Sequence, residues 1–259
     1  MSRALVTGAS AGIGAEFAAK LAATGYDLVL VARSADRLAA SAAALRHRYG
    51  VAVEVLPADL ADPEGCGRVE QRLAQTHEPI DLLVNNAGCG VPGTFLSSTL
   101  ADEEAMLALN VRAVMRLTHA ALPGLRERQG GVINVSSMAG FMPTSRGASY
   151  AASKAWVTMF TESLAMTLAG TGVRVTAVCP GYTTSEFHDR IGQDLSGTPR
   201  WLRLRASQVA TRALADHRRG RTISIPGRRY RIVAVLIRLA PRRVLTVASA
   251  RVTRARHPQ

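Results

Sequence analysis

The sequence predicts an α/β fold, a single doubly wound parallel sheet flanked by helices, with a basic C-terminal extension. Three observations support this prediction. Short apolar runs alternate with helical patterns, a glycine-rich turn follows the first apolar run, and 259 residues suffice for one large α/β domain. The sequence shows no internal repeat and no low-complexity linker that would indicate a second domain.

Apolar periodicity and turn signals give the order of the elements. Strands are predicted at 4–6, 27–32, 51–56, 80–84, 131–135, 173–178 and 222–225. Helices are predicted at 13–24, 35–49, 63–77, 102–129, 148–170 and 207–217. In the first helix, Ile13, Phe17 and Leu21 recur at i, i+4 and i+8, which is one helical face. Because strands and helices alternate, we expect parallel strands with right-handed crossovers.

A glycine-rich turn, Thr7-Gly-Ala-Ser-Ala-Gly-Ile-Gly14, lies between the first strand and the first helix. Its glycines at 8, 12 and 14 allow a tight turn, close approach of the backbone to a phosphate, and close packing of the helix on the strand. The helix start offers free amide groups and the positive end of the helix dipole to a pyrophosphate. With a second strand at 27–32, the segment predicts a dinucleotide site.

Tyr150 and Lys154 are four residues apart within a predicted helix, so both side chains lie on one helical face. A free tyrosine has a pKa near 10 and is a slow acid–base catalyst at neutral pH. A nearby ammonium group stabilises the phenolate and lowers that pKa. The pair therefore predicts a tyrosine that passes a proton to or from a substrate oxygen.

Five motifs occur in one order and spacing: Thr7-Gly-x-x-x-Gly-x-Gly14, Asn85-Asn86-Ala87-Gly88, Asn110, Ser136-Ser137 and Tyr150-x-x-x-Lys154. In this respect the chain resembles the classical short-chain dehydrogenases/reductases over roughly residues 1–227. Pro180-Gly181, after the strand at 173–178, fits the same resemblance. The resemblance implies a Rossmann-fold catalytic domain over 1–227, with a flap at about 182–204, followed by an extension over 228–259.

The resemblance also implies four catalytic roles. Tyr150 would be the acid/base that gives a proton to a carbonyl oxygen in reduction or removes it in alcohol oxidation. Lys154 would lower the Tyr150 pKa and hold the nicotinamide ribose, Ser137 would bind the substrate oxygen, and Asn110 would hold a water of the proton relay. Taken alone, Ser137 could end a strand and Asn110 could cap or break a helix.

The cofactor is expected to contact the glycine-rich turn and the segments that follow the strands. These residues are Gly8, Ser10, Ala11, Gly12, Ile13, Gly14, Arg33, Asp59, Asn86, Ala87, Gly88, Pro180, Gly181, Thr183 and Ser185. Two of these assignments have structural alternatives. Asp59 could be a surface carboxylate, and the Asn85-Asn86 pair could be a plain turn.

The end of the second strand predicts NADP(H) rather than NAD(H). It reads Leu30-Val-Ala-Arg33-Ser34, with no carboxylate before Asp36, and a carboxylate there would repel a 2′-phosphate. Arg33 can bind that phosphate with charge-assisted hydrogen bonds. Ala11 stands where many NADP-preferring relatives carry a second basic residue, and Arg37 is either a further contact or a solvated surface residue.

The flap and the segment after Asn85-Asn86-Ala87-Gly88 are expected to form an apolar substrate pocket. The apolar flap residues are Phe187, Ile191, Leu195, Trp201 and Leu202, and the facing wall is predicted to hold Cys89, Val91 and Phe95. His188 could touch substrate or face solvent. The pocket indicates a hydrophobic ketone or aldehyde and its alcohol. Two alternatives remain, a 3-oxoacyl-thioester or lipid reductase of the same fold and a membrane-associated nucleotide-binding scaffold with little turnover.

The C-terminal part of the chain is strongly basic. Residues 200–259 contain 16 Arg and one acidic residue, Asp216, and so carry +15, whereas the rest of the chain carries −2 of the total of +13. The apolar run 230–240, flanked by arginines, is at about 10 residues too short to span a bilayer. It could cover the substrate pocket or a subunit interface, attach to an anionic membrane, or bind nucleic acid, which the lack of aromatic residues disfavours.

Cysteine spacing and the first residues indicate the compartment. Cys66, Cys89 and Cys179 have neither disulfide-framework nor metal-ligand spacing, so no metal is expected. Met1 to Arg3 lead straight into the first strand without room for a signal peptide. We therefore expect a cytoplasmic enzyme, with attachment to the inner face of a membrane as the alternative that the tail suggests. The resemblance further implies a homodimer or homotetramer built on the helices at 102–129 and 148–170.

Overall fold

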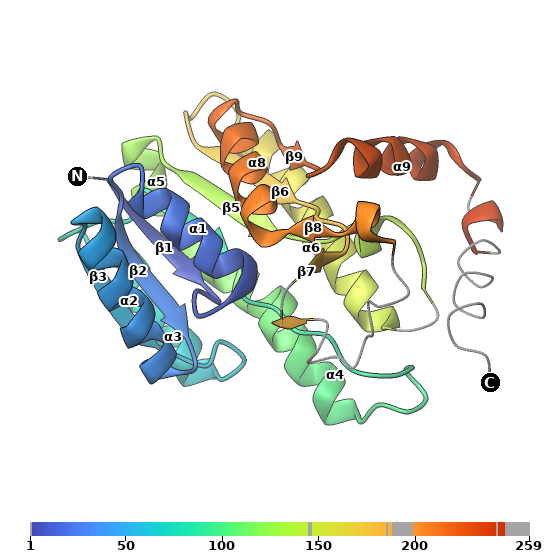
Figure 1. The fold of residues 1–259 in the computed structure, drawn as a ribbon, viewed down its shortest axis with the longest axis horizontal. Helices are drawn as coiled ribbons and strands as arrows, with labels where there is room; N and C mark the ends of the chain where they lie inside the picture. Colours follow the sequence, from blue (N-terminus) through green and yellow to red (C-terminus); the bar gives the residue numbers. More distant parts are fainter. Residues whose placement is uncertain (1, 145–146, 185, 188–198, 242, 247–259) are drawn as a thin grey trace.

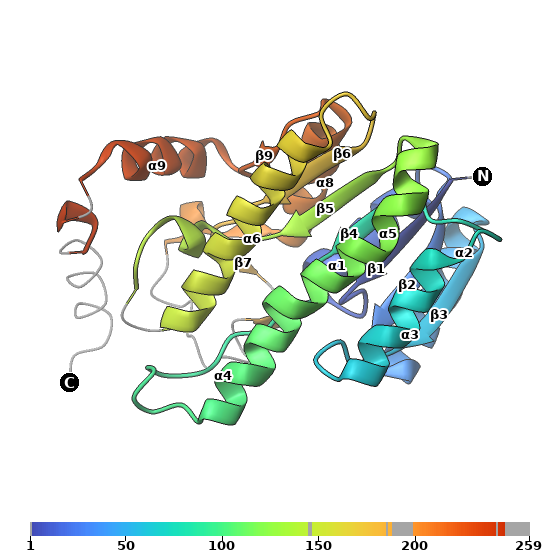
Figure 2. The same cartoon turned by 180° about the vertical axis from the view of Figure 1, so that it is seen from behind.

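The computed structural model describes residues 2–144, 147–184, 186–187, 199–241 and 243–246. Within them, seven parallel strands form one sheet in the order β3-β2-β1-β4-β5-β6-β9, and helices cover both of its faces (Figures 1 and 2). The predicted doubly wound parallel sheet is thus confirmed. β1 is the third of the seven strands, next to the middle strand β4, so the glycine-rich turn leaves the sheet near its centre.

The strands of the sheet are β1 (Arg3–Thr7), β2 (Asp27–Ala32), β3 (Val53–Pro57), β4 (Leu82–Asn85), β5 (Gly131–Val135), β6 (Arg174–Val178) and β9 (Ile223–Ser224). The α-helices are α1 (Gly12–Ala22), α2 (Ala35–Tyr49), α3 (Pro63–Ala74), α4 (Leu100–Leu107), α5 (Val114–Arg128), α6 (Ala148–Thr167), α8 (Ala206–Arg218) and α9 (Arg228–Leu239). Shorter elements are the π-helix η1 (Ala108–Ala113), the 3-10 helices η2 (Met138–Phe141) and η3 (Arg200–Leu202), and the strand pair β7 (Thr183–Thr184) and β8 (Leu204–Arg205).

Two apolar cores lie on opposite faces of the sheet. Because side chains alternate along a strand, Ala4 and Val6 of β1 enter one core and Leu5 enters the other. The first core is completed by α1, α2 and α8, and the second mainly by α3 and α5. The strands are buried on both faces, which explains their continuous apolar runs.

Polar side chains cap the helices that follow β2 and β3. The hydroxyl of Ser34 accepts a hydrogen bond from the Arg37 amide at the start of α2, and Asp62 accepts one from the Gly65 amide (2.8 Å) at the start of α3. Pro63 occupies the first turn of α3. A proline is tolerated there because backbone N–H groups in the first turn form no hydrogen bond within the helix. These caps fix the loops that leave the carboxyl ends of the two strands.

The predicted helix over 102–129 is divided in the structure. α4 and α5 are separated by the π-helix η1, in which Asn110 is fully buried. A π-turn places one extra residue in the turn and is common at functional sites. The side chain of Asn110 bonds to the backbone of Cys89, a contact that helical periodicity does not reveal. The predicted helices over 63–77 and 148–170 also end earlier, at Ala74 and Thr167.

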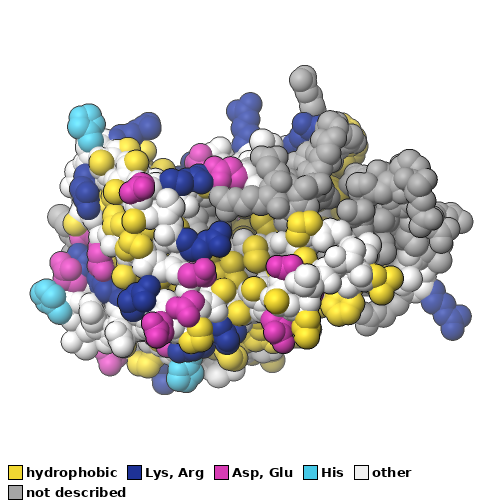
Figure 3. All heavy atoms as spheres, turned by 90° about the horizontal axis from the view of Figure 1, so that it is seen from below, with side chains coloured by type: hydrophobic (Ala, Val, Ile, Leu, Met, Phe, Trp, Pro, Cys, Tyr) yellow, Lys and Arg dark blue, Asp and Glu magenta, His cyan; other side chains and the backbone are white. Residues whose placement is uncertain are grey.

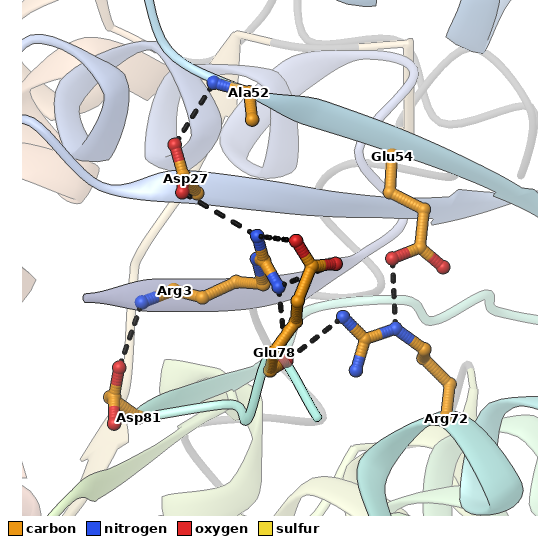
Figure 4. A network of polar contacts seen from close by, with 7 residues as sticks. All are labelled: Arg3, Asp27, Ala52, Glu54, Arg72, Glu78 and Asp81. Atoms are coloured by element: carbon orange, nitrogen blue, oxygen red, sulfur yellow. Dashed lines mark hydrogen bonds and ion pairs between the residues drawn. The ribbon is translucent and has the colours of Figure 1, made fainter. Parts of the chain in front are cut away.

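A polar network ties the loop before β4 to the amino ends of the neighbouring strands (Figure 4). Arg3 of β1 donates hydrogen bonds to the Glu78 carbonyl (3.1 Å) and carboxylate (3.0 Å), and it pairs with Asp27 of β2 at 3.5 Å. Arg72 of α3 donates to Glu54 of β3 (2.8 Å) and also to the Glu78 carbonyl. The network lies at the edge of the sheet opposite the carboxyl ends of the strands.

Candidate active site

A cavity of about 690 Å³ lies at the carboxyl ends of the central strands. Among its lining residues are Gly8, Ser10, Ala11, Gly12, Ile13, Arg33, Asp59, Asn86, Ala87, Gly88, Ser137, Tyr150, Lys154, Pro180, Gly181 and Thr183, all predicted from the sequence. Figure 3 views the molecule from below in Figure 1. Acidic and basic side chains are mixed over its left part, and apolar ones gather toward the middle and right.

Close backbone packing shapes the part of the cavity that the glycine-rich turn lines. Gly8 has a φ of +64°, a backbone conformation that residues other than glycine rarely adopt. Gly14 does not line the cavity but packs behind it. A Cβ atom there would lie 2.2 Å from the Gly8 carbonyl oxygen and 2.4 Å from Nδ2 of Asn86. The turn therefore folds tightly over β4 and leaves backbone amide groups of α1 facing the cavity.

Thr7 joins this turn to the segment after β4. Its buried Oγ1 accepts hydrogen bonds from the backbone amides of Asn86 and Ala87, both at 2.9 Å. Nδ2 of Asn86 donates in return to the Thr7 carbonyl at 2.9 Å. Sequence reasoning gave Thr7 no role, although it opens the glycine motif. Its contacts show that it holds two walls of the cavity in register.

The rim of the cavity carries Arg33, at the end of β2, and Arg37, in the first turn of α2. Arg37 forms a two-pronged ion pair with Glu186, with Nη2–Oε1 at 2.6 Å and Nη1–Oε2 at 3.1 Å, and it also donates to the Ser10 carbonyl. The Glu186 carboxylate raises the pKa of Arg37. Sequence reasoning missed Glu186, which lies 149 residues after Arg37 in the chain. Asp59 lines the same side, and its Oδ1 accepts from the Ala61 amide.

Ser137, Tyr150 and Lys154 line the cavity together. Ser137 follows β5, while Tyr150 and Lys154 lie one turn apart on α6. The backbone amide of Ser136 donates to the Val178 carbonyl (2.7 Å). This contact places the segment after β5 beside the end of β6. The structure thus brings the three predicted side chains to one wall.

Burial dominates the electrostatics of this wall. Burial raises the pKa of Tyr150 to about 12, and a hydrogen bond with Ser137 opposes the rise. Burial lowers the pKa of Lys154 to about 8. Nζ of Lys154 donates to the Val135 carbonyl (3.0 Å) and lies 5.8 Å from the centroid of the Tyr150 ring. Lys154 is not among the groups that lower the Tyr150 pKa here, so that role stays a prediction for the cofactor-bound site.

Asn110 lies behind the cavity wall rather than on it. Its Nδ2 donates to the Cys89 carbonyl (2.8 Å) and to Oγ of Ser153 (3.2 Å), and its Oδ1 accepts from the Cys89 amide (3.0 Å). A Cβ atom on Gly88 would lie 3.1 Å from Oδ1 of Asn110 and 3.2 Å from Nζ of Lys154. Asn110 and Lys154 thus meet at the backbone of Gly88.

Within the described residues of the predicted flap, Phe187 contacts Tyr150. The ring of Phe187 lies 5.6 Å from that of Tyr150, centroid to centroid, and Thr183 is buried with its hydroxyl donating to the Gly181 carbonyl. Cys89 lines the cavity, whereas Val91 and Phe95 do not. The predicted residues Ser185, His188, Ile191 and Leu195 lie outside the described residues.

Tyr230 of α9 holds both ends of the flap, a contact that sequence reasoning missed. Its hydroxyl donates to the Leu202 carbonyl (2.7 Å) and accepts from the Tyr182 amide (3.0 Å). Its ring covers Gly181 so closely that a Cβ atom there would lie 1.9 Å from a ring carbon. The inner side of α9 therefore packs directly on Gly181, which lines the cavity.

The described residues form neither a metal-binding cluster nor a membrane-spanning helix. In this part of the chain, no group of three or more His, Cys, Asp or Glu side chains could hold a metal ion, and the three cysteines are free thiols. None of the described helices combines the length and the apolar character needed to cross a bilayer.

The parallel sheet and the cavity at its carboxyl edge are those of the doubly wound α/β class. Within that class, the chain belongs to the short-chain dehydrogenase/reductase family and is an oxidoreductase of that family, because the family pattern described as short chain dehydrogenase matches residues 2–196.

Relatives of known name agree with this assignment. A ketoacyl reductase of Nostoc sp. is 36% identical over 181 residues, which are 70% of this chain and 63% of that protein. The putative ketoacyl reductase of a monensin polyketide synthase from Streptomyces virginiae is 40% identical over 195 residues, 73% of this chain and 74% of that protein. A short-chain dehydrogenase from Sphingobium yanoikuyae in complex with NADPH has a TM-score of 0.83 at 34% identity, covering 100% of this chain and 97% of that one.

Proposed function

We propose that this chain is an NADP(H)-dependent oxidoreductase that interconverts a hydrophobic ketone or aldehyde and its alcohol. The observation that carries the proposal is the meeting of Ser137, Tyr150 and Lys154 in one cavity with a glycine-rich turn and Arg33. Such a cavity supplies both a phosphate-binding end and a proton-donating end. The two ends are joined by the backbone of Asn86-Ala87-Gly88, along which an extended dinucleotide would lie.

The lining residues fit a dinucleotide. The tight turn at Gly8 to Gly14 presents the amino end of α1, which suits a pyrophosphate, and Arg33 suits the 2′-phosphate. The NADPH bound to the Sphingobium yanoikuyae relative supports the same cofactor. Asp59 would lie beside the adenine, and Pro180, Gly181, Thr183 and Ser185 are proposed to hold the nicotinamide end. The cofactor supplies or accepts the hydride when bound.

In the proposed reduction, Tyr150 gives its hydroxyl proton to the substrate oxygen as that oxygen gains negative charge. Ser137 donates a hydrogen bond to the same oxygen. Lys154 holds the ribose of the cofactor and stabilises the phenolate that remains on Tyr150. Asn110, through the backbone at Cys89, keeps the wall beside Lys154 in place and is proposed to hold a water that returns the proton.

The substrate end of the cavity is apolar. Phe187 packs against Tyr150, and Leu109 and Cys89 also line the cavity. This lining suits a hydrophobic carbonyl compound. A 3-oxoacyl thioester is the second candidate, supported by the two relatives named as ketoacyl reductases. A scaffold that binds nucleotide with little turnover is the third, and the meeting of catalytic groups in the cavity weighs against it.

The deciding experiment follows NADPH oxidation with hydrophobic aldehydes, ketones and 3-oxoacyl thioesters, with NADH in parallel. In Tyr150→Phe we expect kcat to fall by about 10²- to 10⁴-fold, the usual contribution of a general acid, while NADPH still binds. Tyr49→Phe, at the end of α2, is the matched control and should keep full activity. Turnover in Tyr150→Phe equal to the parent enzyme would refute the proposed role. NADPH binding without turnover on any compound would favour the scaffold.

We further propose a cytoplasmic homodimer or homotetramer that works at or near a membrane, with a catalytic domain over 1–227 and an extension over 228–259. Exposed apolar side chains on α5 and α6, Met115, Met159 and Met166, support assembly through these helices. The packing of Tyr230 on Gly181 supports a role for the start of the extension in holding the flap.

A further inference from the structure

α9 has two apolar sides. Tyr230 and Ala234 face inward and are buried against the body of the protein. Ile232, Val235, Leu236 and Leu239 are 62%, 55%, 61% and 77% exposed. Their spacing of i, i+3, i+4 and i+7 places them on one stripe, about opposite to the buried side. Figures 1 and 2 show α9 beyond β9, at the end of the molecule far from β3.

Arginines flank this outward stripe. Arg228, Arg229 and Arg238 of α9 and Arg243 after it are exposed, and the sequence contains no Asp or Glu after Asp216. Arg229 lies over the Trp201 ring at 4.8 Å from its centroid, and Arg238 lies over Phe141 at 5.6 Å. These contacts hold the two guanidinium groups against aromatic rings that lie outside α9.

We propose that the outward face of α9 is a docking surface for an anionic phospholipid membrane. A helix that lies in the lipid–water interface combines an exposed apolar stripe with flanking basic residues. The stripe enters the acyl boundary while the arginines meet lipid phosphates, for which the guanidinium fork is suited. Twelve helical residues reach about 18 Å, against a hydrocarbon core of about 30 Å, so α9 would lie in the plane of the membrane.

The charge of this face argues against two other occupants. In a symmetric contact between two copies, the arginines of one α9 would face those of the other, with no carboxylate on either helix to pair with them. A nucleic acid would match the arginines, but the stripe between them has only aliphatic side chains and no aromatic ring on which a base could stack.

Docking leaves the inner contacts of α9 intact. Tyr230 fixes the helix to Gly181 and Leu202, so the outward stripe stays exposed without any rearrangement of the helix. The same contacts hold the inner side of α9, opposite to the proposed membrane side, against Gly181 and the Leu202 carbonyl. A surface of this kind would hold the enzyme where apolar substrates are dissolved.

Flotation of the full-length protein with vesicles tests this proposal. Vesicles of phosphatidylcholine with about 30% phosphatidylglycerol are compared with pure phosphatidylcholine vesicles. We expect binding to the anionic vesicles only, weakened as salt rises from about 0.05 to 0.5 M. The double variant L236D/L239D should lose at least about tenfold of the bound fraction because it places charges in the acyl boundary. L96D alters a side chain that is 97% exposed in a loop outside α9, and it should bind as the parent does.

Other results would overturn the proposal. Equal flotation of the parent and L236D/L239D, or equal binding to both kinds of vesicle, would exclude this face as an anionic-lipid surface. A concentration-dependent molar mass that the double variant alone lowers, without vesicle binding by the parent, would assign the face to a second copy. Because the changed side chains are exposed, the melting temperature should be unaffected. R228E/R243E gives an independent charge-reversal test if L236D/L239D is unstable.

Discussion

Arg33 and Arg37 share the rim of the cavity but differ in their surroundings. The carboxylate of Glu186 neutralises Arg37, whereas Arg33 forms no ion pair within the described part of the chain. A doubly charged 2′-phosphate is attracted more strongly to an unneutralised guanidinium. Arg33 is therefore the stronger candidate for distinguishing NADPH from NADH.

Replacing Arg33 with alanine should weaken the use of NADPH selectively. Hydrogen bonds to a charged group contribute about 1.5–3 kcal/mol, so kcat/KM for NADPH should fall about 10- to 100-fold. NADH, which lacks the 2′-phosphate, should change little. Steady-state kinetics with both cofactors measure this, with Arg48→Ala, an exposed residue late in α2, as the control. Equal losses with both cofactors would contradict the assignment.

The raised pKa of Tyr150 also bears on the direction of the reaction. With a pKa of about 12, the hydroxyl keeps its proton at neutral pH. A protonated phenol is ready to donate to a carbonyl oxygen, as reduction requires. Removal of a proton from an alcohol would need the phenolate, which burial disfavours unless a bound cationic group stabilises it.

At the scale of elements, one side chain of α9 joins the two ends of the flap. The Tyr230 hydroxyl bonds to the backbone of Tyr182, before β7, and of Leu202, before β8. β7 and β8 are two residues each, so the pair has little stability of its own. The two hydrogen bonds of the Tyr230 hydroxyl, called the clamp below, offset this low stability because they fix the segments that lead into both strands.

Tyr230→Phe should loosen the flap while preserving the packing of the ring. It removes two hydrogen bonds to the backbone, each worth about 1 kcal/mol. We expect KM for substrate to rise about 3- to 10-fold, with little change in the affinity for NADPH. Limited proteolysis should cut the flap faster in this variant. Tyr26→Phe, remote from the flap, is the control, and unchanged proteolysis and KM would show that the clamp has no such role.

At the scale of the whole molecule, the buried His217 of α8 links stability to pH. Burial, with smaller contributions from the positive charges of Arg174 and Arg218, lowers its pKa to about 4. Its Nδ1 lies 3.0 Å from the Thr176 hydroxyl of β6. Between about pH 4 and 6.5 the unfolded chain holds a proton on this imidazole that the folded protein does not. The folded state is therefore stabilised above pH 6.5 and loses this contribution as the pH falls toward 4.

His217→Asn, which can keep a hydrogen bond to Thr176, should flatten the pH dependence of unfolding. A shift of this size corresponds to about 3 kcal/mol. Denaturant unfolding at several pH values between about 4 and 7 should show the parent losing that much more stability than the variant. Carboxylates titrate in both proteins and cancel in the difference. Parallel curves for the two proteins would exclude His217 as the cause.

Local signals allowed much of this fold to be predicted. α2 begins and ends at the predicted residues because Ser34 caps its start and Gly50 follows its end. The glycine-rich turn can likewise be recognised from the sequence alone. The remaining features depend on tertiary contacts. Asn110 of the π-helix bonds to Cys89, Arg37 pairs with Glu186, and Tyr230 packs on Gly181. None of these pairings leaves a periodic pattern in the sequence.

The order of the strands has a consequence for the synthesis of the chain on the ribosome. β2 and then β3 extend the sheet from one side of β1, and β4, β5, β6 and β9 extend it in turn from the other. Each newly translated strand therefore finds an open edge, and none has to be inserted between two strands already joined. Since domains can begin to fold while translation continues, this sheet can be assembled in the order in which its strands leave the ribosome.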